Sequence, residues 1–152
     1  MNNIYDPDIQ HAPMYCVGFQ LQDERQKETL KILNHKGNID FSIMCAVYVP
    51  NSFKEHTYNQ HGRLFFTCLN SNGIVVDQKI GELPLETEKS SEPSLIRYAV
   101  RFNFSDFAGS ELNLQIAWTN KHDGEMGIGE SLRIGRFVNT MIPVIAHHDG
   151  DN

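Results

Sequence analysis

Two histidines lie five residues apart in a polar stretch of the chain, and histidine is the most common metal ligand in proteins. His56 and His61 belong to the run Lys-Glu-His-Thr-Tyr-Asn-Gln-His at positions 54–61. A residue from a second loop, His122 or Asp123, would complete a zinc site with three protein ligands and one open position. A solvated polar loop is the more common reason for such histidines, and the helical H-E-x-x-H motif does not occur. The metal-site prediction is His56, His61, His122 and Asp123.

A glycine-rich acidic segment, residues 121–130, is a second candidate cation site. Its carboxylates, Asp123, Glu125 and Glu130, offer the oxygen ligands that calcium prefers. The spacing is not that of an EF-hand, and the glycines do not form a phosphate-binding fingerprint. Turns that need positive φ angles are the more frequent reason for clustered glycines. We therefore expect no cofactor, with calcium or zinc as the alternatives.

Three aromatic residues are candidates for ligand contact. Tyr48, Phe53 and Tyr58 are expected on or beside strands whose second face is partly apolar. Exposed rings on a sheet face stack on sugar rings or form protein interfaces. The alternative is that a loop covers the same face and buries the rings.

Arg97 and Arg101 alternate on the polar side of one predicted strand and complete the ligand-binding prediction. Four strand residues span about 13 Å, so the two guanidinium groups cannot grip a single phosphate together. Aligned with Arg133 or Arg136 from another strand, they would form a face for an anionic ligand. Ordinary cross-strand pairing with Asp or Glu is the more common role of such arginines.

The three cysteines, Cys16, Cys45 and Cys68, each lie in an apolar stretch and form no C-x-x-C pair. Free cysteine behaves as a small buried hydrophobe, so we expect reduced core thiols and a reducing compartment. No G-x-S-x-G motif occurs, and no Ser-His-Asp set has a recognisable spacing. The sequence therefore predicts a protein that is not an enzyme.

Strands must position these residues, because apolar side chains recur with a period of two through much of the chain. Between Arg97 and Phe104, large apolar residues alternate with arginine, alanine and asparagine, and residues 111–119 repeat the pattern. A helix would place alternate residues on different faces, so both segments are predicted strands. Further predicted strands are residues 15–21, 39–49, 63–69, 74–80, 132–138 and 142–146.

The segment 63–69 is apolar on both faces, which is typical of a central strand. The turn at residues 70–73, Asn-Ser-Asn-Gly, predicts a hairpin between it and residues 74–80. The acidic segment 82–94 is expected to cross between two sheets.

Residues 24–34 allow two interpretations. A capping box at residues 23–26 and a stop at Gly37 favour a short helix. The alternation of Leu30 and Ile32 favours a strand that forms a hairpin with residues 39–49. We favour the strand slightly, because short isolated helices are marginally stable.

The predicted fold class is all-β: an antiparallel β-sandwich, Ig-like or jelly-roll-like, with seven to eight strands and the short helix near residues 24–34 as an alternative. A chain of 152 residues suits one domain, so residues 1–152 are predicted to form it, with loose termini at 1–13 and 147–152. This architecture serves many functions, so it assigns none.

The formal net charge of −6 argues against a general nucleic-acid binder, which needs a basic surface, and against docking on anionic membranes. No apolar run approaches the roughly 18 residues of a spanning helix. The first residues lack the basic and apolar regions of a secretory signal. We expect a cytoplasmic protein, or a mature fragment from which a signal has been removed.

The leading functional prediction is a non-enzymatic binding or assembly module that acts through protein–protein contacts, self-association included. It rests on surplus apolar positions on the second faces of residues 39–49 and 63–69. The first alternative is a small-ligand or carbohydrate-binding sandwich with a loop calcium site. The second alternative is a metal-dependent hydrolase that uses His56, His61 and His122.

Overall fold

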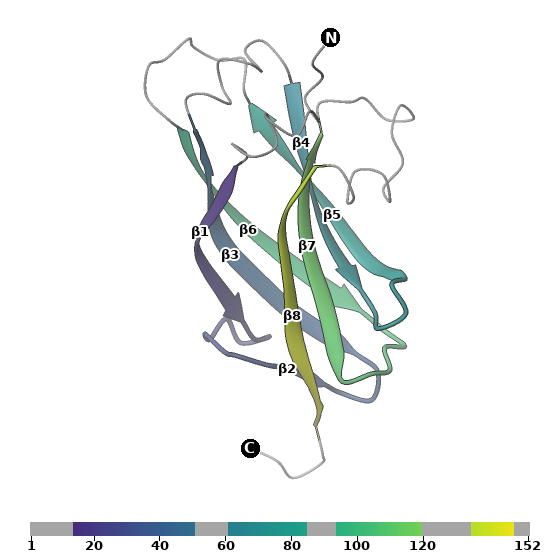
Figure 1. The fold of residues 1–152 in the computed structure, drawn as a ribbon. Coiled ribbons are helices and arrows are strands. Elements are labelled where there is room, and N and C mark those ends of the chain that lie inside the picture. The colour runs from purple at the N-terminus through teal and green to yellow at the C-terminus, as the bar shows by residue number, and fades with distance from the viewer. Residues whose placement is uncertain (1–13, 51–60, 85–93, 120–134, 148–152) are drawn as a thin grey trace.

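A computed structural model describes residues 14–50, 61–84, 94–119 and 135–147, and within these ranges every regular element is a β-strand. The strands form two sheets that pack face to face (Figure 1). The fold is therefore all-β, as the sequence predicts. In chain order the strands are β1 (Tyr15–Gln22), β2 (Ile32–Asn34), β3 (Ile39–Val49), β4 (His61–Leu69), β5 (Val75–Pro84), β6 (Ser94–Phe104), β7 (Glu111–Thr119) and β8 (Arg136–Ala146).

One sheet has three strands in the order β1-β3-β6, and the other has five in the order β2-β8-β7-β4-β5. All pairs of neighbouring strands are antiparallel except β2 and β8, which run parallel. The chain changes sheets between β5 and β6, so the expected crossing at residues 82–94 is confirmed. It changes sheets again between β6 and β7, which therefore do not form a hairpin.

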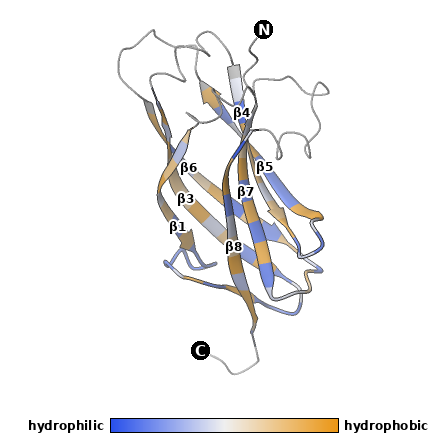
Figure 2. Ribbon diagram, in the orientation of Figure 1, coloured by the Kyte–Doolittle hydropathy of each residue, from blue (hydrophilic) through white to orange (hydrophobic). Residues whose placement is uncertain are grey.

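The alternating pattern determines which side of each strand faces the other sheet. Along β3, the odd-numbered residues from Ile39 to Val49 are all buried, and the even-numbered residues are partly or largely exposed. Figure 2 shows the same alternation of apolar and polar residues along β3 and β7. At the centre of the core, the rings of Phe41 and Phe102 stack with centroids 5.1 Å apart.

The β4–β5 hairpin forms as predicted, with His61 paired to Pro84 at one end and Leu69 paired to Val75 at the other. In its turn, the Asn70 side-chain oxygen accepts hydrogen bonds from the backbone of Asn72 and Ile74. Gly73 supplies the positive φ angle of 76° that this turn requires. β4 lies between β5 and β7, and all its side chains from Leu64 to Leu69 are buried, as expected for a central strand.

The helical interpretation of residues 24–34 is wrong, because the described part of this chain contains no helix. The Asp23 carboxylate accepts hydrogen bonds from the backbone N–H groups of Arg25 and Lys27, which closes a turn instead of capping a helix. A strand does form at Ile32–Asn34, but it pairs with β8 and not with β3. Leu30 is 88% exposed and belongs to no strand. No helix in the described ranges could cross a membrane.

The predicted strands 132–138 and 142–146 correspond to one strand, β8, within the described residues. Residues 132–134 lie outside the described ranges. β8 pairs with β7 over most of its length, and a register shift falls between Ile116 and Ala117 of β7. Near its end, the N–H of His147 donates a hydrogen bond of 2.9 Å to the carbonyl of Asn34.

Candidate functional site

The outer face of the three-stranded sheet, which points away from the five-stranded sheet, carries several exposed apolar side chains. Its residues follow from the pairing of β1, β3 and β6. Tyr15, Val17, Met44 and Leu95 on this face are each 40% exposed or more. Paired residues from the three strands form rows across this face. Starting from the end where Val49 pairs with Ser94, four of the rows are Tyr15-Tyr48-Leu95, Val17-Ala46-Arg97, Gln20-Met44-Ala99 and Gln22-Ser42-Arg101.

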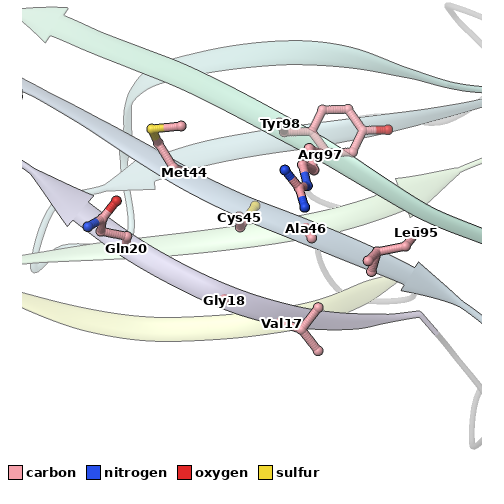
Figure 3. A pocket seen from close by; sticks show the side chains of 9 residues that line it. All are labelled: Val17, Gly18, Gln20, Met44, Cys45, Ala46, Leu95, Arg97 and Tyr98. Atoms are coloured by element: carbon pink, nitrogen blue, oxygen red, sulfur yellow. The ribbon is translucent and has the colours of Figure 1, made fainter.

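A hollow of about 320 Å³ lies in this outer face. Ala46, on the central strand, is the smallest side chain of its row, so it leaves space between Val17 on β1 and Arg97 on β6. Figure 3 shows Ala46 between these two residues. The lining residues are Val17, Gly18, Gln20, Met44, Cys45, Ala46, Leu95, Arg97 and Tyr98.

A β-bulge in β1 shapes one side of the hollow. Val17 pairs with Ala46 and Gln20 pairs with Met44, so β1 has one residue more than β3 between these pairs. Gly18 takes a φ of 64° there, a conformation that L-residues with a side chain rarely adopt. The bulge therefore places a residue without a side chain beside the hollow.

The polar groups of the hollow are Arg97 and Gln20. The Arg97 side chain is exposed and forms no ion pair with any described residue. The side-chain oxygen of Gln20 accepts a hydrogen bond of 3.1 Å from Gln22, which leaves the Gln20 amide N–H groups available as donors. A guanidinium and an amide beside apolar walls suit a ligand with an apolar surface and an anionic or hydroxyl-bearing edge.

Aromatic rings border the hollow at the end of the face where β3 ends. Tyr48, predicted as a ligand-binding residue, lies on the outer face, and its ring centroid is 6.3 Å from that of Tyr15. The side chain of Tyr98 points into the core instead, where its hydroxyl donates a 2.8 Å hydrogen bond to the carbonyl of Glu82. Burial raises the pKa of Tyr98, so its phenol stays protonated.

Arg101 lies on the same face as Arg97 but outside the hollow, and it is paired. Its Nε and Nη2 donate hydrogen bonds to the two carboxylate oxygens of Asp40 at 2.9 and 2.7 Å. This is the ordinary cross-strand pairing expected of a strand arginine. The hydrogen bonds from Arg101 hold the pKa of the Asp40 carboxyl below its usual value. Arg101 therefore stabilises the face, and Arg97 remains available to a ligand.

The Asp40–Arg101 pair makes the stability of this sheet depend on pH. Because the folded pKa of Asp40 is lowered, its stabilising effect is full above the unfolded value of about 3.9 and is lost as the pH falls through the folded value. We expect Asp40→Asn to lower the melting temperature at pH 7, and the difference from wild type to shrink below about pH 4. Thermal unfolding of both proteins between pH 2.5 and about 7 checks this; a difference that grows on acidification contradicts it.

The predicted metal site is largely outside the described residues. His56, His122 and Asp123 lie there, and so do the candidate ligand residues Phe53 and Tyr58. His61 is the first residue of β4. Within the described ranges, no three His, Cys, Asp or Glu side chains come together as a metal-binding group.

Two expectations about the sheet faces are wrong. Arg136 lies on β8 of the five-stranded sheet and does not align with Arg97 and Arg101. The second face of residues 63–69 is not open, because Phe65, Thr67 and Leu69 are buried. Of the two second faces expected to be apolar and open, only that of residues 39–49 is therefore available.

Sequence reasoning missed Val17, Gln20, Ala46 and Leu95 as site residues. The alternating pattern does place Ala46 on the second face of its strand, and a small residue between Met44 and Tyr48 was the one available sign of a hollow. The neighbours from β1 and β6 are set by strand order, which alternation does not determine.

No family model matches this sequence, and a search of the curated proteins finds no match. Among solved structures, a β-glucuronidase from glycoside hydrolase family 2 is similar to 90% of this chain, with 10% identity and a TM-score of 0.44. This chain covers only 11% of that enzyme.

The C-terminal domain of Wzt is also similar, with 7% identity and a TM-score of 0.50. The match covers 93% of this chain and 77% of that one. Likeness at such low identity extends to the fold alone, so the similarity to the Wzt domain supports a β-sandwich and does not indicate a ligand.

Proposed function

We propose that this protein is a non-enzymatic binding module that holds an acidic carbohydrate on the outer face of its three-stranded sheet. The observation that carries the proposal is the guanidinium of Arg97, which forms no ion pair with any described residue and lies at an apolar hollow. Sugar rings have apolar faces that pack on aliphatic and aromatic side chains, and a carboxylate on the ring would pair with Arg97. The hydroxyl groups of the sugar would accept hydrogen bonds from Gln20.

The dimensions of the site favour a compact ligand. Its volume of about 320 Å³ is at the lower end of ligand pockets, which measure about 300–1,000 Å³. Strands about 4.8 Å apart, with eight residues in β1 and eleven each in β3 and β6, give the outer face a footprint of about 480 Å². A stable protein interface buries about 800 Å² per partner, so a globular partner would need contacts beyond this face.

The charge of Arg97 also argues against pairing of two copies of this face. In a twofold interface each copy presents the same surface, so Arg97 would need an acidic partner from the other copy. Among the residues of β1, β3 and β6 on this face, Asp40, paired with Asn103, is the one acidic residue, and Arg101 already binds both of its oxygens. Glu28 is bridged to Gln22 beyond the edge of β1. A buried guanidinium without a partner is costly, so an external anionic group fits the face better than a second copy.

Titration calorimetry with matched sugars tests the proposal. We expect oligomers of galacturonic or glucuronic acid to bind and the neutral galactose and glucose oligomers to bind at least tenfold more weakly. Arg97→Gln should weaken acidic binding by at least tenfold, because a hydrogen bond to a charged group contributes about 1.5–3 kcal/mol. Arg101→Gln is the matched control, since it lies on the same strand outside the hollow, and it should leave the affinity within about twofold.

A second pair of variants tests the hollow itself. Ala46→Trp fills the space between Val17 and Arg97 and should abolish binding, whereas Asn103→Trp, three rows away on the same face, should not. Equal affinity for neutral and acidic sugars would reject the role of Arg97. Absence of binding to every oligomer would reject the carbohydrate proposal altogether.

A protein partner is the second candidate, favoured by the exposed apolar residues Tyr15, Phe19 and Leu95, of which Leu95 is 54% exposed. Light scattering at several protein concentrations tests whether the protein partner is a second copy of this chain. A mass that rises with concentration in the wild type but not in Leu95→Glu would support it over the carbohydrate proposal.

A further inference from the structure

Two cysteines lie on neighbouring strands and face the same side of the sheet. Cys16 of β1 pairs with Val47 of β3, and Cys45 lies two residues from Val47 along the same strand. Residues two apart in a strand point to the same side, so the Cys16 and Cys45 side chains both face the core. They are diagonal neighbours across the β1–β3 pair. Diagonal neighbours lie about 7–8 Å apart and disulfide-linked residues at most about 6.8 Å, so a disulfide here would draw the two strands closer together.

Each of the two thiols shifts the pKa of the other. The Cys45 thiol donates a hydrogen bond to the Cys16 sulfur, which lowers the pKa of Cys16 and raises that of Cys45. Cys45 is buried, whereas Cys16 is partly exposed and lies on β1, an edge strand of its sheet. The Cys16 thiol therefore ionises more readily than the Cys45 thiol and is partly exposed, and Cys45 lies on the neighbouring strand. A reactive thiol beside a second thiol is the usual arrangement of a redox-sensitive pair.

We propose that Cys16 and Cys45 form an intramolecular disulfide when the protein meets a hydroperoxide. The Cys16 thiolate attacks the terminal oxygen of the peroxide, the O–O bond breaks, and the sulfur is oxidised to a sulfenic acid while the peroxide is reduced to an alcohol or water. The Cys45 sulfur then attacks the Cys16 sulfur, the S–O bond breaks, and water leaves with the Cys45 proton. A small dithiol reverses the reaction by thiol–disulfide exchange.

The third cysteine provides an internal control. Cys68 lies on β4 in the other sheet, is fully buried, and has a raised pKa, chiefly because of burial. It offers no exposed thiolate to the peroxide. The proposal therefore predicts that oxidation consumes two of the three thiols and spares Cys68.

The disulfide would act on the strand that borders the hollow. Cys16 precedes Val17 and the bulge at Gly18, and Cys45 precedes Ala46 at the centre of the outer face. A covalent bond at this position joins the outermost strand β1 to the central strand β3. This inference does not depend on which ligand the face binds.

Treatment of the full chain with hydrogen peroxide, followed by mass spectrometry and thiol counting, tests the proposal. We expect the wild type to lose the mass of two hydrogen atoms and to fall from three free thiols to one, with a Cys16–Cys45 peptide in the digest. Cys68→Ser should give the same linked peptide. Cys16→Ser should give none and should keep its thiols at least tenfold longer, because Cys45 is buried.

Several results would overturn the proposal. They are a sulfinic or sulfonic acid on Cys16 with Cys45 still reduced, a disulfide between two chains through Cys16, or equal oxidation of Cys68 and Cys16. A circular dichroism spectrum of each variant before oxidation establishes that it is folded. If a serine variant does not fold, alkylation of the native protein decides: iodoacetamide should modify Cys16 before Cys68, and the alkylated protein should then form no disulfide.

Discussion

Phe102→Ala is expected to destabilise the protein by about 3–5 kcal/mol, the largest effect of any single substitution considered. Phe102 is fully buried, and its ring stacks on Phe41 of the neighbouring strand at a centroid distance of 5.1 Å and an interplanar angle of 24°. The substitution removes an aromatic ring from the layer between the two sheets and leaves a cavity that neighbouring strands cannot close. Most of the surrounding side chains are held in rigid strands, so the site relaxes little.

Urea denaturation followed by tryptophan fluorescence measures this change, since Trp118 is the only tryptophan and is buried. Asn103→Ala is the matched control, because Asn103 is the next residue on β6 and is exposed. It should change the unfolding free energy by no more than about 0.5 kcal/mol. A loss below about 1 kcal/mol for Phe102→Ala would contradict the packing of the two sheets around this pair.

Asn34→Ala is expected to cost about 2–3 kcal/mol, because the Asn34 side chain connects two separate segments. Its oxygen accepts a 2.6 Å hydrogen bond from the N–H of Gly37, and its nitrogen donates a 3.1 Å hydrogen bond to the carbonyl of Phe107. Phe107 itself is buried, and its N–H donates to the carbonyl of Gly37. Removal of the amide leaves polar groups of both segments without partners.

The same denaturation measurement tests this second prediction. Asn38→Ala provides the control, since Asn38 lies in the same turn, is exposed, and pairs with His35 only through backbone groups. It should be nearly neutral. Equal effects of the two substitutions would show that the Asn34 amide does not join the segments.

Much of the fold could be predicted from the sequence, because alternation of apolar and polar residues directly reports a strand with one buried face. The strands at 39–49, 97–104 and 111–119 are confirmed, and so is the hairpin whose turn ends at Gly73. In these segments the local pattern and the tertiary packing favour the same conformation. Residues 63–69, apolar on both faces, are confirmed as a central strand for the same reason.

The pairing of β2 could not be predicted, because a strand of three residues has almost no periodicity of its own. Proximity in sequence suggested a hairpin with residues 39–49, whereas the chain turns at Lys36 and Gly37 and enters the other sheet. The partner of β2 is more than 100 residues away, and nothing local in the sequence indicates it.

The candidate site was predictable only in part. Tyr48 and Arg97 were identified from residue type and strand face, and they lie at or beside the hollow. Arg101, chosen on the same grounds, binds Asp40, and only the register between β3 and β6 distinguishes the two arginines. The hollow depends on a small residue surrounded by side chains of three strands. It can therefore be recognised only when the order of the strands in the sheet is known.

The parallel pair of β2 and β8 affects how the chain is made. Ile32 is buried and pairs with Val144, which follows it by 112 positions. At a synthesis rate of about 5–20 residues per second, the ribosome needs roughly 6–20 s to deliver that partner. During this interval the five-stranded sheet lacks β8, so β2 and β7 have no strand partner on that side and the core lacks Ile142 and Val144. Newly made chains are therefore most prone to aggregate, and most suited to capture by a chaperone, until β8 emerges.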